Sequence, residues 1–146
     1  MAVIYNTIDV EFPKEIKRRE ISIWIKEVAA QYQRRVGDIA YVFCSDEELL
    51  QMNKQYLNHH FYTDIITFDY SEKNKISGDL FISLDSIKSN AEKFGTEYVE
   101  ELFRVMIHGV LHLCGLKDKL PKDKKMMRQG EEEALAVLAI SQGLKK

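Results

Sequence analysis

Cysteine and long hydrophobic runs are scarce in this chain of 146 residues, and each scarcity excludes a class of protein. The two cysteines, Cys44 and Cys114, form no Cys-x-x-Cys pair, which argues against a disulfide framework and against a four-cysteine zinc site. No apolar run reaches the roughly 18 residues of a membrane-spanning helix, and residues 1–12 lack the apolar core of a secretory signal. We therefore expect a soluble cytoplasmic protein that does not contact membranes.

Internal repeats, linkers and low-complexity segments are also absent from the sequence. A chain of this length with 45% hydrophobic residues can bury about two thirds of the surface that its unfolded form exposes. We expect residues 1–146 to form one domain. The net charge of −2 indicates little about partners, but residues 117–128 concentrate positive charge. This basic run consists of Lys117, Lys119, Lys122, Lys124, Lys125 and Arg128.

Hydrophobic periodicity and turn residues predict the first half of the secondary structure. We expect a strand over residues 2–12, a helix over 13–35 that Gly37 ends, and a second strand over 39–43. A capping box follows, in which Ser45 and Glu48 begin a helix that ends near residue 57. The β-rich residues 64–70 and 76–83 then flank a polar turn, which predicts a hairpin.

Three helices complete the predicted order. The first spans residues 85–95, the second is capped by Thr96 and ended by Gly115, and the third spans about 122–142. Apolar residues surround much of the middle helix, which is typical of a buried central helix. This order favours an α+β domain in which a small mixed β-sheet packs against helices.

The stretch HGVLHLCGLKD of the central helix has the spacing of a metal site. His108 and His112 stand four residues apart, so a helix presents both imidazoles on one face, about 40° apart around its axis. Gly115 can take a positive φ and turn the chain back toward that face. Asp118 then supplies a carboxylate that binds zinc well, whereas Cys114 points away at helical spacing.

One divalent metal per chain, zinc, is the prediction from this stretch, with His108, His112 and Asp118 as ligands. Three protein ligands leave one coordination position open, which is typical of catalytic zinc. The alternative is a pair of polar helix residues that binds no metal.

This stretch resembles the motifs of two protein families. The metzincin peptidases share the spacing His-x-x-x-His-x-x-Gly-x-x-(His or Asp), but they carry a glutamate general base where this chain has Gly109. The stretch resembles more closely the run His-Gly-x-Leu-His-Leu-x-Gly-Tyr-Asp-His, which marks the YbeY family of bacterial endoribonucleases. In that family three histidines hold a metal, usually taken to be zinc. The closer resemblance implies a ribonuclease rather than a peptidase.

Further segments resemble the same family in the same order along the chain, over roughly residues 40–140. They match the family's Leu-Asn, Thr-Asp-Val-Leu-Ser-Phe, Gly-Asp-Ile-x-Ile-Ser and Met-x-x-x-Glu elements. The segments are Leu57-Asn58, residues 63–68 (TDIITF), residues 78–83 (GDLFIS), and Met127 with Glu131.

Three departures from the family pattern bear on chemistry. Asp118 stands where the third histidine is expected, and Leu116-Lys117 replace the preceding Tyr-Asp. An anionic ligand should leave the metal a weaker Lewis acid and its bound water a weaker acid. The family also carries a Tyr-Arg in the loop that residues 59–62 (HHFY) fill here. The cation expected to steady a phosphate is therefore gone or supplied elsewhere.

The resemblance implies a single-strand-specific, metal-dependent endoribonuclease that acts in ribosomal RNA maturation and ribosome quality control. The implied partners are single-stranded and ribosomal RNA, with ribosomal subunits or assembly factors; no DNA is expected. The basic run is the candidate RNA-binding surface, because phosphate neutralisation dominates the binding of single strands.

The sequence offers several candidates for the catalytic residues and does not choose among them. Gly109 has no side chain to take a proton, so the candidates for the general base are His59 and His60, besides water activated by the metal. Asp79 is expected to bond the backbone or a metal-binding histidine. The alternatives to a nuclease are a ribosome assembly factor with a structural metal and, less favoured, a metal-dependent peptidase or other hydrolase.

Overall fold

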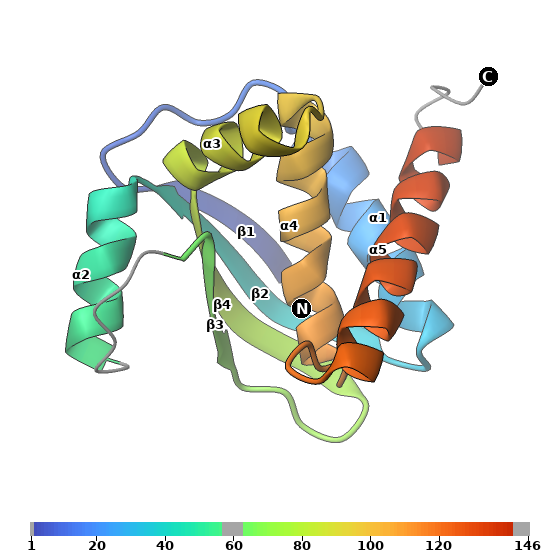
Figure 1. Cartoon of the computed structure of the whole chain (residues 1–146). Helices are drawn as coiled ribbons and strands as arrows, with labels where there is room; N and C mark the ends of the chain where they lie inside the picture. The colour runs from blue at the N-terminus through green and yellow to red at the C-terminus, as the bar shows by residue number, and fades with distance from the viewer. Residues whose placement is uncertain (1, 57–62, 142–146) are drawn as a thin grey trace.

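Four strands and five helices make up the part of the chain that the computed structural model describes, residues 2–56 and 63–141 (Figure 1). The strands are β1 (Ala2–Thr7), β2 (Arg35–Cys44), β3 (Ile65–Asp69) and β4 (Lys75–Ser83). The helices are α1 (Arg18–Gln31), α2 (Asp46–Tyr56), α3 (Leu84–Phe94), α4 (Tyr98–Leu113) and α5 (Pro121–Ser141). The predicted order of strands and helices is confirmed.

The sheet is mixed, with the strand order β1-β2-β4-β3. Strands β1, β2 and β4 are parallel neighbours, while β3 pairs with β4 in the antiparallel sense, with Ile66 opposite Phe81. The antiparallel pair is the predicted hairpin, and it places β3 at the edge of the sheet. The α+β class with a small mixed sheet is confirmed.

The larger hydrophobic core lies between one face of the sheet and helices α1, α4 and α5 (Figure 1). Strand β2 alternates with the period of two that a sheet imposes, so Ile39, Tyr41 and Phe43 are buried on this face. Hydrogen bonds connect elements that surround this core. The Tyr41 hydroxyl donates to the Met106 carbonyl at 2.9 Å, and Trp24 Nε1 of α1 donates to the Ala134 carbonyl of α5 at 2.8 Å.

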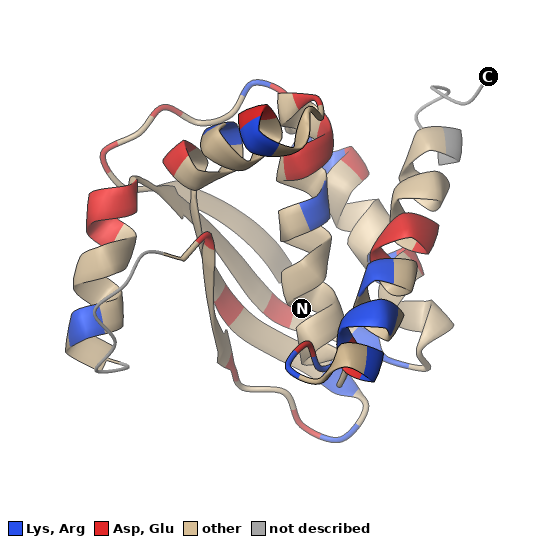
Figure 2. Ribbon diagram, in the orientation of Figure 1, with Lys and Arg blue, Asp and Glu red and all other residues tan. Residues whose placement is uncertain are grey.

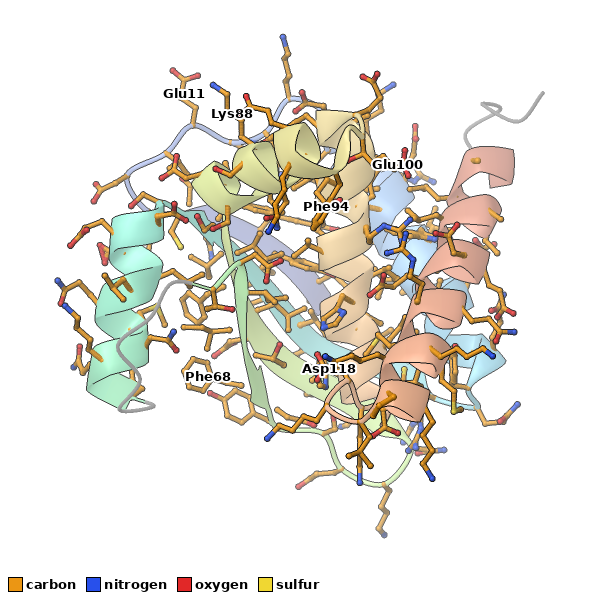
Figure 3. All side chains as sticks on the ribbon, in the orientation of Figure 1. Glu11, Phe68, Lys88, Phe94, Glu100 and Asp118 are labelled. Atoms are coloured by element: carbon orange, nitrogen blue, oxygen red, sulfur yellow. The ribbon has the colours of Figure 1, made fainter. Side chains whose placement is uncertain are left out.

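A smaller cluster lies on the opposite face of the sheet, beneath α2. Its buried members are Cys44, Leu49 and Ile66. Phe68, which Figure 3 labels on the α2 side of β3, packs against this cluster and contacts the ring of Phe81 edge to face.

The predicted boundaries around α1 were wrong. Strand β1 ends at Thr7 rather than at residue 12, and α1 spans Arg18–Gln31 instead of 13–35. Gln33 takes a φ of 57° two residues after the helix, which turns the chain. Gly37 lies inside β2 beside an irregularity in the β2–β4 pairing, where a Cβ atom would collide with the Ser77 hydroxyl. The glycine serves a close approach between strands and not a helix end.

Around α3 and α4 most boundaries match their predicted positions. Gly95 takes the left-handed conformation at the end of α3, and Gly115 has a φ of 106° after α4. The helix starts differ from prediction, because α3 begins at Leu84 with Ser83 as its N-cap residue, and Glu97 rather than Thr96 is the N-cap residue of α4. None of the described helices combines the length and hydrophobicity that a membrane-spanning segment requires.

Candidate metal centre

The two histidines of the motif project from the middle and the end of α4, whose other faces are buried. Buried residues precede and follow each histidine in the helix, so α4 is fixed against the core while one face meets solvent. The rings of His108 and His112 are 5.1 Å apart between centroids. The chain turns at Gly115 and brings Asp118 to the same face, where Figure 3 labels it beside the end of α4.

The three predicted ligands converge on one point. Asp118 Oδ2 lies 3.2 Å from His108 Nε2 and 3.3 Å from His112 Nε2. One ligand atom from each residue lies within 4.8 Å of the other two. Two atoms that bind zinc tetrahedrally at roughly 2.1 Å are separated by roughly 3.4 Å. The spacing of these donors therefore fits a small divalent cation such as zinc.

Gly109 faces the sheet. A Cβ atom at this position would lie 3.0 Å from Ile65 Cδ1 and about 3.1 Å from both Leu80 Cδ atoms. Such contacts are tighter than ordinary van der Waals packing. A glutamate at position 109 would therefore need to enter the core between α4 and the β3–β4 hairpin. The absence of the peptidase glutamate has a packing reason in this fold.

Behind the histidines, α5 contributes a buried carboxylate. Glu131 is 7% exposed, and its Oε2 lies 2.7 Å from His108 Nδ1. Arg104 Nη1 donates to Glu131 Oε1 at 3.0 Å, and Arg104 Nη2 donates to Glu132 Oε2 at 2.6 Å. Glu131 was noted in the sequence only as part of a motif, and Arg104 was missed because its partners are 27 and 28 residues away.

The electrostatics of the site follow from this network. Burial lowers the pKa of His108, but the hydrogen bond and charge of Glu131, together with the charges of Asp118 and Asp64, outweigh it and leave the pKa raised. Burial also raises the pKa of Asp64, which His108 partly offsets. The site therefore attracts positive charge, as a cation-binding site should.

A cavity of about 700 Å³ borders the three ligands. Residues of β3 and of the segment before it form one wall, and α4 forms another. Its described lining carries five carboxylates and two cations. The carboxylates are Asp64, Asp69, Glu101, Asp118 and Glu131, and the cations are Arg104 and Lys119.

The basic run includes Lys119 of the cavity lining and continues along the first turns of α5, where Figure 2 shows Lys and Arg gathered. All six of its basic residues are exposed. Lys119 alone among them lines the cavity, while Lys117 and Lys122 line a neighbouring hollow with Leu120 and Met126.

Comparison with known proteins identifies relatives over nearly the whole chain. The family described as Endoribonuclease YbeY matches residues 5–139. The chain belongs to the Endoribonuclease YbeY family. It is 58% identical to Endoribonuclease YbeY of Bacteroides thetaiotaomicron, over 94% of this chain and 99% of that protein. The Bacteroides fragilis protein is 56% identical, over 94% and 98%, and that of Porphyromonas gingivalis 53% identical, over 88% and 85%.

A solved structure supports the fold of this YbeY family member. The solution structure of a protein from Thermotoga maritima superposes with a TM-score of 0.68 at 21% identity, over 95% of this chain and 91% of that one. This likeness concerns the fold alone, which is a small α+β domain in both proteins.

The structure brings together some of the predicted site residues of this YbeY family member and not others. His108, His112 and Asp118 meet as the spacing predicted. His59 and His60 lie outside the described residues. The prediction for Asp79 was wrong, because its carboxylate accepts a hydrogen bond from the Tyr70 hydroxyl at 3.3 Å. Glu131 holds the place beside a histidine that Asp79 was expected to take.

Proposed function

We propose that this chain is a single-strand-specific endoribonuclease that depends on one zinc ion and acts in ribosomal RNA maturation and ribosome quality control. The observation that carries the proposal is the family match over residues 5–139, combined with the convergence of His108, His112 and Asp118 beside a cavity. The relatives from Bacteroides and Porphyromonas bear the name Endoribonuclease YbeY.

Zinc would be held by His108 Nε2, His112 Nε2 and a carboxylate oxygen of Asp118. When bound, the ion supplies Lewis acidity toward a phosphoryl oxygen and lowers the pKa of water. The carboxylate ligand reduces both effects relative to a third imidazole. Asp118 therefore sets how strongly the ion can act.

Ribonucleic acid would approach over the basic run, where positive charge offsets the phosphates. Lys119 would contact the phosphate nearest the metal, since it belongs to both the basic run and the cavity lining. The other residues of the basic run would neutralise phosphates outside the cavity. This arrangement offers a cation for the phosphate despite the missing loop arginine.

The proposal also covers the partners and the domain organisation of the protein. Ribosomal RNA implies contact with ribosomal subunits or assembly factors in the cytoplasm. Residues 1–146 would act as one domain. A metal-dependent peptidase is disfavoured by the packing of Gly109 against Ile65 and Leu80.

Metal content and cleavage measured together test the proposal. The pure protein, its Asp118→Ala variant and an Asp123→Ala control would be assayed for bound zinc, and for cleavage of an RNA given single-stranded or as a duplex. The wild type and the control should hold about one zinc ion per chain and cut the single strand, while Asp118→Ala should lose both properties. Zinc binding without cleavage would sink the nuclease function and favour a structural metal in an assembly factor.

Salt dependence tests the RNA path. Each lost phosphate contact reduces the slope of log affinity against log salt by roughly 0.7 for a single strand. Lys119→Ala and Lys125→Ala should each reduce the slope by this amount, but only Lys119→Ala should also slow cleavage at saturating RNA. Equal cleavage rates in both variants would show that Lys119 does not contact the phosphate that is cut.

A further inference from the structure

Glu131 is the one described carboxylate that contacts the far side of a histidine in the metal centre. It reaches His108 from α5, across 23 residues of sequence, and it is 7% exposed. A buried carboxylate is costly unless it is hydrogen-bonded and paired with a cation. The structure supplies both compensations, since one oxygen contacts His108 Nδ1 at 2.7 Å and the other accepts from Arg104 at 3.0 Å.

The two nitrogens of His108 face different partners. Nδ1 faces Glu131, whereas Nε2 faces Asp118 Oδ2 at 3.2 Å. An ionised carboxylate can only accept a hydrogen bond, so the hydrogen bond to Glu131 requires a proton on Nδ1. In the neutral imidazole this arrangement leaves the lone pair on Nε2, the nitrogen directed toward the other ligands.

His112 lacks comparable support among the described residues. Within residues 2–56 and 63–141 its polar contact is with Asp118 at 3.3 Å, and its side chain is 34% exposed, compared with 21% for His108. The same helix thus presents one histidine with polar contacts at both ring nitrogens and one whose polar partner, within the described part of the chain, is Asp118.

Arg104 fixes the carboxylate in turn. It lies four residues before His108 on the same face of α4, and its side chain is 12% exposed. Its Nη2 also binds Glu132 at 2.6 Å and lies 3.7 Å from Glu100. Because the guanidinium is a planar fork with donors in fixed positions, the contact of Nη1 with Glu131 Oε1 sets the position of that carboxylate relative to α4.

We propose that Glu131 is a positioning residue of the metal centre, which sets the tautomer and ring orientation of His108, and that Arg104 holds Glu131 in place for this task. Partners of this kind behind a metal-binding histidine typically change metal affinity by about 10- to 100-fold when they are removed. The proposal rests on the proposed function only in taking His108 as a metal ligand.

Metal affinity provides the first test. Zinc binding would be measured by competition with a chelator for the full-length wild type and for Glu131→Ala, Glu131→Gln and Glu132→Gln. We expect Glu131→Ala to weaken zinc binding by roughly 10- to 100-fold, and Glu131→Gln to lose less because its amide oxygen still accepts from Nδ1. Glu132 contacts Arg104 but not His108, so Glu132→Gln should keep its zinc affinity within about twofold of the wild-type value.

The tautomer of His108 provides a second test that a merely structural role of Glu131 would not satisfy. Nitrogen-15 spectra of the imidazoles in the metal-free protein, at a pH where His108 is neutral, should show the proton on Nδ1 of His108. Glu131→Gln should keep this tautomer, and Glu131→Ala should lose it while the signals of His112 stay unchanged. Thermal unfolding of each variant would establish that it is folded.

Several results would overturn the proposal. They are a proton on Nε2 of His108 in the wild type, zinc affinity of Glu131→Ala equal to that of the wild type, or equal losses in Glu131→Ala and Glu132→Gln. These outcomes are separate from the failure of the nuclease function. A protein that binds zinc through His108 without cutting RNA would lose that function and keep the role of Glu131.

Discussion

The two faces of the sheet differ in what packs on them and in what they can support. On one face, α1, α4 and α5 cover a continuous core that includes Trp24 and Tyr41, both nearly or fully buried. On the other face, α2 covers a cluster with three buried members, Cys44, Leu49 and Ile66. The candidate metal centre, His108, His112 and Asp118, and the Glu131 carboxylate beside it lie on the α4 side.

This contrast between the two faces explains the location of the candidate metal centre. Metal ligands need fixed directions, and a helix packed on a large dry core supplies them. The α4 face also brings charges into a partly buried setting, where Glu101 and Glu131 are each 7% exposed. The smaller α2 face offers no comparable set of buried charges within the described residues. Changes on the two faces should therefore have unequal effects.

The largest effect is expected at Gly109. Gly109→Glu would place a charge between α4, Ile65 and Leu80, where the space is already tight for a single Cβ atom. Burial of an unpaired charge together with overpacking should lower the free energy of unfolding by at least about 3 kcal/mol. Urea unfolding monitored by circular dichroism measures this loss.

A control on the same helix separates packing from helix formation. Val99→Glu lies at a position of α4 that is 36% exposed and should change stability by less than about 0.5 kcal/mol. If Gly109→Glu were as stable as this control, the packing reason for the missing glutamate would be wrong.

The next largest effect on the free energy of unfolding is expected when one buried leucine from each face is truncated. Leu80 is fully buried beneath α4, and Leu49 is 1% exposed beneath α2. Truncation of a buried leucine to alanine costs roughly 2–5 kcal/mol. We expect Leu80→Ala near the upper end and Leu49→Ala near the lower end, because partly buried neighbours such as Met52 can close the smaller cavity.

The zinc affinities of the same two leucine variants provide a further comparison of the faces. Leu80 packs against Gly109, the residue that follows His108, so Leu80→Ala should weaken zinc binding. Leu49→Ala should leave zinc binding unchanged. Equal effects of the two variants on affinity would contradict the claim that only the α4 face supports the metal centre.

The smallest effect concerns pH and Glu101. Burial raises the pKa of this carboxyl above its usual 4.5, the charge of Arg104 opposes the rise, and Asp64 and Glu131 add to it. The folded state therefore favours the protonated form of Glu101 more than the unfolded state does. Its contribution to stability is complete below about pH 4.5 and is lost as the pH rises through the folded pKa.

Glu101→Gln should remove this loss. We expect the variant to raise the midpoint temperature of unfolding at pH 7 and to change it little at pH 4. A Glu11→Gln variant, which removes an exposed carboxylate outside the helices and strands, serves as the control. A larger stabilisation at pH 4 than at pH 7 would reverse the assigned sign.

Local sequence signals predicted those parts of the fold that neighbouring residues decide. Gly95 and Gly115 end helices where expected, because each takes a backbone conformation that few other residues adopt. Gly37 misled the prediction, since the same residue type also permits close strand pairing, which depends on Ser77 far along the chain. A glycine by itself does not distinguish a helix end from a tight contact.

The candidate site divides in the same way. His108, His112, Gly115 and Asp118 lie within eleven residues, so helical spacing and one turn were enough to predict their convergence. Local sequence patterns were thus enough to predict the order of elements and the convergence of three candidate ligands. The parallel pairing of β1, β2 and β4, the packing around Gly109, and the contacts of Arg104 and Glu131 behind His108 became visible in the folded chain alone. These features depend on how α4 packs against α5 and the sheet, and no periodicity within a single segment encodes that packing.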